Sequence, residues 1–237
     1  MKKSVMILVM VFAAALGFGQ KNVRQTASNF LKEGKLDKAL EAINQCVQDP
    51  STATDSKSWL IRGNVYMEIA NSQDEKYKSL DPNPFPKALE SYKKALEVDP
   101  KKEMQKKEYY GDIAVRIDNQ YKGLFDNAIA SYNKKDFKGA MENFGRSAEV
   151  LEVIGMTDTL SLLNAALCAG MANDRGAAKG YYLKLLQGNY KSPSLYSSLS
   201  DIYLKEKDSA NAFRYIRMGL KQYPTNMGLF NSEINIY

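Results

Sequence analysis

One arrangement of alanine, bulky and small residues recurs five times along the chain. Each copy has an alanine, a bulky apolar or aromatic residue four positions later, and a small or apolar residue three positions after that. Offsets of four and three place the three side chains on one face of a helix. A repeated helical face predicts a stack of similar helices rather than one globular core. We call this arrangement the cassette; its copies are Ala39/Ile43/Cys46, Ala88/Tyr92/Ala95, Ala140/Phe144/Ser147, Ala178/Tyr182/Leu185 and Ala212/Ile216/Gly219.

The fifth cassette is preceded by a second helical pattern. Leu199, Ser200 and Tyr203 lie upstream of it, and Pro224 lies downstream. With the cassette, they occupy positions 7, 8, 11, 20, 24, 27 and 32 of a pattern with a period of roughly 34 residues. In these residues the chain resembles the tetratricopeptide repeat (TPR) family. The resemblance implies an all-α fold, in which TPR-type helix-turn-helix repeats stack into a right-handed solenoid.

The distances between cassettes indicate that two of the repeats are irregular. Ala178 and Ala212 are 34 residues apart, whereas Ala39 and Ala88 are 49 apart, and Ala88 and Ala140 are 52 apart. The second and third repeats therefore contain additional residues.

The additional residues have a different character in each repeat. In the second, Pro82, Pro84 and Pro86 disfavour a helix, so we expect an insertion over 71–86 in an extended or turn conformation. In the third, residues 103–133 contain no proline and carry apolar residues at helical spacing, which predicts one long, extended first helix of about eight turns. The predicted TPR solenoid covers 20–237, with repeats at about 20–53, 56–100, 103–156, 159–192 and 193–226 and a partial repeat at 227–237.

The first nineteen residues have the pattern of a secretory signal peptide. Lys2 and Lys3 precede an apolar run from Val5 to Leu16, and Gly17, Phe18 and Gly19 follow it. A membrane anchor is the alternative, but a span needs about 20 apolar residues and this run is shorter. We therefore expect cleavage of residues 1–19, no stable membrane insertion afterwards, and an exported protein of the periplasm or cell envelope.

Composition argues against most kinds of enzyme site. The chain contains no histidine, which excludes Ser-His-Asp and Cys-His catalysis and histidine-ligated zinc. Cys46 and Cys168 fall in different repeats, and no glycine-rich phosphate loop is present. Paired carboxylates remain an open alternative, because 27 Asp and Glu residues are distributed along the chain. We expect no catalytic residues, no metal and no cofactor.

Net charge argues against nucleic acid as a partner. The formal net charge is +6, and loss of Lys2 and Lys3 with the signal peptide (+6 − 2) leaves +4. Nucleic-acid binding requires a strongly basic face, which this balance does not supply.

The TPR resemblance also implies where a partner would bind. In TPR proteins the first helices of successive repeats line a concave groove, and their positions 2, 5, 9, 12 and 13 face the ligand. The groove implied for this chain is basic at its start and apolar in its middle, and an exposed apolar patch of that kind usually marks a partner site. Its candidate residues are Arg24, Lys57, Asn64, Phe125, Ile129, Tyr132, Leu160, Leu163, Leu167 and Met171.

An alternative is that the apolar middle is filled from within the chain. Either the long helix from Glu103 or the insertion, with Phe85, would then fold back over it. Long insertions in compact folds are packed about as often as they are functional.

We interpret the sequence as a non-enzymatic scaffold or adaptor of the bacterial cell envelope, which binds a protein or peptide segment in the concave TPR groove. A first alternative is a binding protein for an envelope glycan or small exported ligand. Its site would use the proline-rich insertion and tyrosines outside packing positions, such as Tyr77, Tyr109 and Tyr190. A second alternative is an accessory N-terminal segment of a larger protein.

Overall fold

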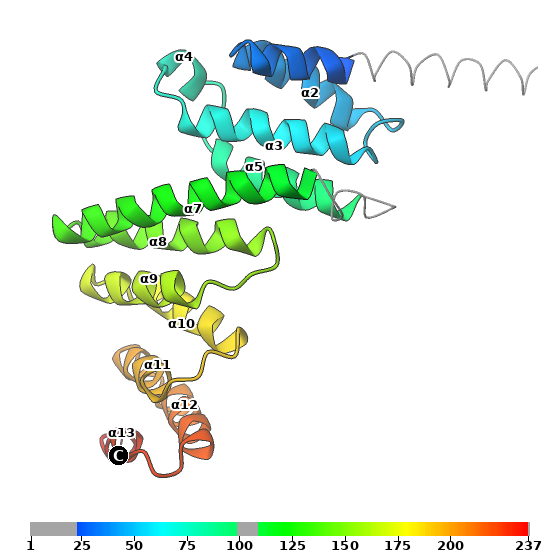
Figure 1. Cartoon of the computed structure of the whole chain (residues 1–237). Helices are drawn as coiled ribbons and strands as arrows, with labels where there is room; N and C mark the ends of the chain where they lie inside the picture. Colours follow the sequence, from blue (N-terminus) through cyan, green and yellow to red (C-terminus); the bar gives the residue numbers. More distant parts are fainter. Residues whose placement is uncertain (1–22, 99–108, 237) are drawn as a thin grey trace, which may run out of the picture. The chain divides into compact units, whose positions relative to one another are not determined.

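The computed structural model describes residues 23–98 and 109–236 of the chain, apart from the side chains of 109, 110 and 112. The expected signal peptide and residues 103–108 of the expected long helix lie outside these ranges. All regular structure within them is helical, as predicted (Figure 1). The described chain divides into two compact units, and the division falls between Arg116 and Ile117.

In its described residues, the first unit contains the helical residues 23–32 and four further helices, followed by the start of the long helix α7 (Tyr109–Asn133). These four are α2 (Leu36–Gln48), α3 (Ser56–Asn71), α4 (Glu75–Lys78) and α5 (Pro84–Glu97). Helix α3 packs against both α2 and α5.

The second unit contains the rest of α7 and six further helices (Figure 1). Each helix from α8 onward packs against the next in the chain, and α13 also contacts α11. The unit is therefore a stack of helical hairpins. The six helices are α8 (Phe137–Glu152), α9 (Thr159–Met171), α10 (Arg175–Gln187), α11 (Pro193–Lys205), α12 (Ser209–Gln222) and α13 (Met227–Ile234).

Every residue of the five cassettes is buried, so the repeated face is the packing face. Small residues in it permit close approach between helices. A Cβ added at Gly63 would overlap the ring of the buried Tyr92, and one added at Gly219 would lie 2.8 Å from the Cβ of Tyr196. The helix axes can therefore approach only because these positions lack a side chain.

Four of the turns inside the hairpins share one construction, and the connection between α3 and α5 differs from them. The second residue after the first helix has a positive φ, at Gly34, Lys135, Asn173 and Lys207. The residue after it precedes the next helix, and in the last three turns it is an aspartate that caps that helix. A left-handed residue stops a helix, and a side-chain carboxylate pairs the free N–H groups of the next one.

The insertion differs in part from the expected extended segment. It contains the short helix α4, and α5 begins at Pro84, inside the stretch expected to be non-helical. Proline is compatible with the first turn of a helix because the N–H that it lacks would have no partner there. Helix α4 is attached to the first hairpin, since the Tyr77 hydroxyl donates to the Gly34 carbonyl at 2.8 Å and Lys76 pairs with Asp37 at 2.9 Å.

Candidate partner-binding groove

A mostly apolar hollow of about 260 Å³ lies between α7 and α9 in the second unit. We call it the α7–α9 groove. It is lined by Phe125, Ile129 and Tyr132 from α7, Phe144 from α8, and Asn164, Leu167, Cys168 and Met171 from α9.

The helical period of α7 and α9 forms the two walls. On α7, Leu124 and Ala128 are buried in the packing face, and the next residue after each, Phe125 and Ile129, lines the groove. Adjacent residues of a helix point about 100° apart, so a helix packed on one side presents the other to solvent. The same rule places Leu167 of α9 in the groove, where it is 47% exposed.

Aromatic contacts hold the floor of the groove. The rings of Phe125 and Phe144 meet edge to face with their centroids 5.3 Å apart, and Phe144 is only 4% exposed. Near the C-terminal end of α7, the ring of Tyr132 packs edge to face against the ring of Phe137, with their centroids 5.8 Å apart. Because these rings support one another, the hollow is present in the chain on its own.

The groove carries almost no charge. Helix α9 has no charged residue in its sequence, and the α7 segment from Phe125 to Asn133 has only Asp126. Burial raises the pKa of the Cys168 thiol, so the sulfur at the floor stays neutral at pH 7. Apolar contact and hydrogen bonding are therefore the interactions that this surface offers.

Five of the residues expected from sequence come together in this groove. They are Phe125, Ile129, Tyr132, Leu167 and Met171. The other two residues of the apolar set lie differently. Leu160 is exposed on α9 but does not line the hollow, and Leu163 is half-buried and packs against the core.

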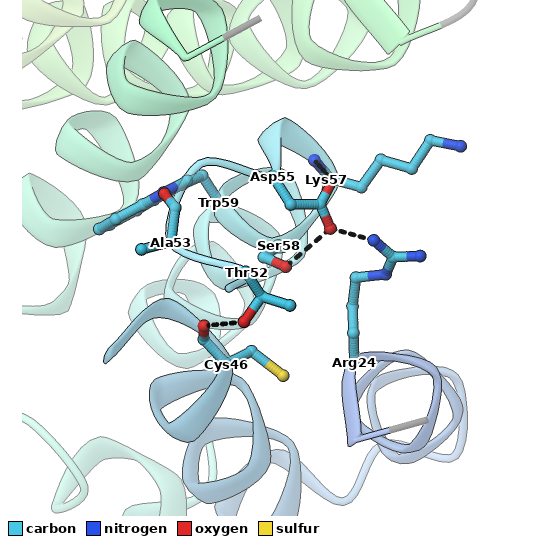
Figure 2. A network of polar contacts seen from close by, with 8 residues as sticks. All are labelled: Arg24, Cys46, Thr52, Ala53, Asp55, Lys57, Ser58 and Trp59. Atoms are coloured by element: carbon cyan, nitrogen blue, oxygen red, sulfur yellow. Dashed lines mark hydrogen bonds and ion pairs between the residues drawn. The ribbon is translucent and has the colours of Figure 1, made fainter. Parts of the chain in front are cut away.

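The polar candidates belong to the first unit, and two of them have partners inside it. Asn64 is 8% exposed and accepts a hydrogen bond from the Tyr92 hydroxyl at 2.9 Å. Arg24 pairs with the Asp55 carboxylate (Figure 2). Lys57 is exposed at the start of α3, and its side chain extends away from the other residues drawn in Figure 2.

Figure 2 shows the polar contacts around the ion pair that Arg24 makes inside the first unit. Asp55 caps α3 by accepting from the Lys57 N–H at 3.2 Å, and it also accepts from the Ser58 hydroxyl at 3.0 Å. The Thr52 hydroxyl donates to the Cys46 carbonyl at 2.6 Å, beside this cap. The guanidinium of Arg24 therefore links helix 23–32 to the start of α3, and its partners lie within the unit.

Three lining residues were not expected from sequence. Phe144 and Cys168 face both the core and the groove. Asn164 directly follows Leu163, which belongs to the groove positions implied by the TPR resemblance, but is not itself one of those positions. A signal for Asn164 existed, because it is the one amide in the otherwise apolar or small sequence of α9.

The structure also bears on the alternatives of an internally filled groove and a glycan site. Residues 117–133 of α7 form a wall of the groove rather than its cover, and Phe85 is buried in α5. The Tyr77 hydroxyl donates to the Gly34 carbonyl, and the Lys76 ammonium lies 5.0 Å from the centroid of the Tyr77 ring. Tyr190 is partly buried against the core of the second unit, and the side chain of Tyr109 lies outside the described residues.

Neither a metal site nor a membrane-spanning helix is found in the described part of the chain. No group of three or more Cys, Asp or Glu residues there could hold a metal ion. None of the helices described is long and apolar enough to cross a bilayer.

The fold can now be assigned from the hairpins, their buried cassettes and the left-handed turns within them. The chain has a TPR-type fold. No family model and no curated protein matches it. TPR structures are nevertheless found among the solved structures with a similar arrangement of helices.

One is the P58(IPK) TPR domain, at 16% identity and a TM-score of 0.46, where the match covers 92% of this chain and 64% of that one. A second is YrrB, described as a TPR protein with an unusual peptide-binding site, at 12% identity and a TM-score of 0.41, covering 89% and 90%. A third is TTC0263, a thermophilic TPR protein of Thermus thermophilus, at 15% identity and a TM-score of 0.36, covering 92% and 98%. These likenesses concern the fold alone.

Proposed function

We propose that this TPR chain is a non-enzymatic scaffold that binds a segment of another protein in the α7–α9 groove. The observation that carries the proposal is the pair of exposed apolar rows facing one hollow, Ile129 and Tyr132 on α7 and Leu167 and Met171 on α9. Each of these side chains is between 43% and 48% exposed.

Covering these rows would stabilise a complex. Burying the exposed half of a large apolar side chain contributes about 1 kcal/mol or more, and the two rows together offer several such contributions. Because Phe125 and Phe144 already support the floor, little conformational entropy is lost on binding. A preformed apolar groove without charge is suited to an apolar protein segment.

We further propose that the scaffold works outside the cytoplasm, in the periplasm or cell envelope. The support is the charged, apolar and small-residue order of residues 1–19. The absence of histidine and the separation of the two cysteines in different helices favour binding over catalysis.

Photo-crosslinking in the native cell tests the function and the location together. A photoreactive residue at position 167 is expected to give a discrete protein adduct in the periplasmic fraction. The control is position 218, where Met218 is 39% exposed on α12, outside the groove. Equal adducts at both positions, or none at 167, would contradict the proposal, and an adduct confined to the cytoplasm would contradict the location.

The variant Leu167→Glu tests the same groove with purified protein. A carboxylate in an apolar interface is expected to weaken capture of the crosslinked partner at least about 100-fold, because it loses water without gaining a pair. The melting temperature should stay close to that of the wild type, since the side chain is half exposed. Met218→Glu is the matched control and should retain the partner.

A further inference from the structure

One face of α12 is basic, and the helix contains no acidic residue. Arg214, Arg217 and Lys221 are spaced three and four residues apart, so they form one row along the helix, and all three side chains are exposed. We call them the α12 basic row. Arg217 pairs with Glu233 of α13 at 3.4 Å but stays 66% exposed. Within the described residues, neither Arg214 nor Lys221 takes part in an ion pair.

The other helices that contain a cassette compensate their cations. Helices α2, α5 and α8 carry aspartate or glutamate among them. Helix α10 has no acidic residue, but Lys179 pairs with Glu206 at 2.7 Å and Lys184 pairs with Glu152 at 3.5 Å. Like charges three and four residues apart repel each other, so the α12 basic row is unfavourable for the helix on its own. This cost indicates that the row has an anionic partner outside the chain.

Exposed apolar side chains lie beside the α12 basic row, on the helix that packs against α12. Met227, Phe230 and Ile234 of α13 are 67%, 40% and 68% exposed, and offsets of three and four place them on one face. Glu233 is three residues after Phe230 and one before Ile234, so its pair with Arg217 brings this face next to the row. We call the row and the three apolar side chains together the α12–α13 face.

Anionic phospholipid matches both components of this face. Arginine and lysine are attracted to phosphate headgroups, and exposed apolar side chains enter the boundary between the headgroups and the acyl chains. Met227 and Ile234 are each about two-thirds exposed and project from the surface. A protein partner would need a hollow shaped for each of them, whereas lipid closes around a projecting side chain of any shape.

We propose that the α12–α13 face holds the protein on an anionic phospholipid membrane. The attachment is peripheral, at the depth of the headgroups, and involves no spanning helix. The inference goes beyond the proposed function, because no residue of α12 or α13 lines the α7–α9 groove. A protein segment bound in that groove would then be held at the membrane surface.

An environment-sensitive fluorophore attached to Ile234→Cys tests the contact locally. The native Cys46 and Cys168 are buried, so labelling of the folded chain is directed to position 234. On vesicles of equal parts phosphatidylglycerol and phosphatidylcholine, the emission should shift to the blue, because the probe leaves water. Vesicles of phosphatidylcholine alone should give no shift. The control is a probe on Val115→Cys of α7, where the side chain is 61% exposed; it should not shift on either vesicle, whatever residues 1–19 bind.

A pair of charge variants tests the α12 basic row. Arg214→Gln combined with Lys221→Gln should weaken vesicle binding about 10- to 30-fold, as measured by titrating the probe at position 234. Lys134→Gln combined with Lys138→Gln removes the same charge from exposed positions near the start of α8, and should change binding much less. Salt at 1 M should weaken binding of the wild type, because it shortens the screening length to about 3 Å. The melting temperature of the α12 variant should not fall, since its cations repel each other.

Three outcomes would overturn the inference: no shift of the probe at position 234, an equal shift on phosphatidylcholine alone, or equal losses in the two double variants. Binding of polyglutamate without a shift on vesicles would also overturn it and would assign the face to an acidic protein. These results are independent of the proposed function. The α12 double variant should retain the protein adduct from position 167, and Leu167→Glu should retain binding to anionic vesicles.

Discussion

Gly63 and Tyr92 show how a single atom controls the distance between two helices. Gly63 lies on α3 and Tyr92 on α5, and the tyrosine ring occupies the space that a Cβ would need. The ring is fully buried and its hydroxyl donates to Asn64, so it cannot easily move aside. The glycine is therefore required by packing, not by an unusual backbone angle.

Gly63→Ala is expected to lower the free energy of unfolding by about 1–3 kcal/mol, the usual effect of overpacking a dense core. Urea unfolding followed by circular dichroism measures it. Gly123→Ala on α7 is the control, because a Cβ there meets no atom within 4 Å. It should be neutral or stabilise by about 0.5–1 kcal/mol. Equal effects of the two substitutions would show that the Tyr92 ring can move to make room for the added Cβ.

At the scale of elements, aspartates determine where several helices begin. Asp208 accepts from the Asn211 N–H at 3.0 Å and from the Asn211 side chain at 2.6 Å, at the start of α12. These hydrogen bonds, the backbone one first, hold the pKa of Asp208 below its usual value. A carboxyl whose folded pKa is lowered stabilises the fold above its unfolded pKa of about 3.9, and this contribution is lost as pH falls through the folded pKa.

Asp208→Asn is expected to reduce the acid sensitivity of the protein. Asparagine can still cap a helix but does not titrate, so the drop in melting temperature from pH 5 to about pH 2.5 should be smaller than in the wild type. Scanning calorimetry at the two pH values measures the difference. Asp201→Asn on α11 is the control, and a change as large in that variant would mean that the cap of α12 is not responsible.

Sequence reasoning could predict those features of the helices that depend on local period. The cassettes follow from spacing along one helix. The α7 and α9 rows that contain Ile129 and Leu167 were implied by the TPR resemblance, and both residues line the groove. Arg24 and Asn64 could not be interpreted in this way, because their partners Asp55 and Tyr92 lie 31 and 28 residues further on. The start of α5 at Pro84 was also missed, since a proline-rich stretch is compatible with both a loop and a first helical turn.

At the scale of the whole molecule, a helical repeat array differs from a globular core in how stability is distributed. Each hairpin contacts only its neighbours, so a local loss of packing should remain local. The end of the second unit illustrates this. Leu229 of α13 is 1% exposed and packs in one cluster with Tyr196 and Ile216, which belong to α11 and α12.

Leu229→Ala is therefore expected to destabilise α11, α12 and α13 by about 2–5 kcal/mol while leaving α3 and α5 of the first unit unchanged. Hydrogen exchange followed by mass spectrometry resolves the two regions. Ile234→Ala is the matched control on the same helix, where the side chain is 68% exposed, and it should change little. A uniform loss of protection in both units would mean that the chain unfolds as one cooperative body, and local variants such as Leu167→Glu would then have to be judged by their effect on global stability.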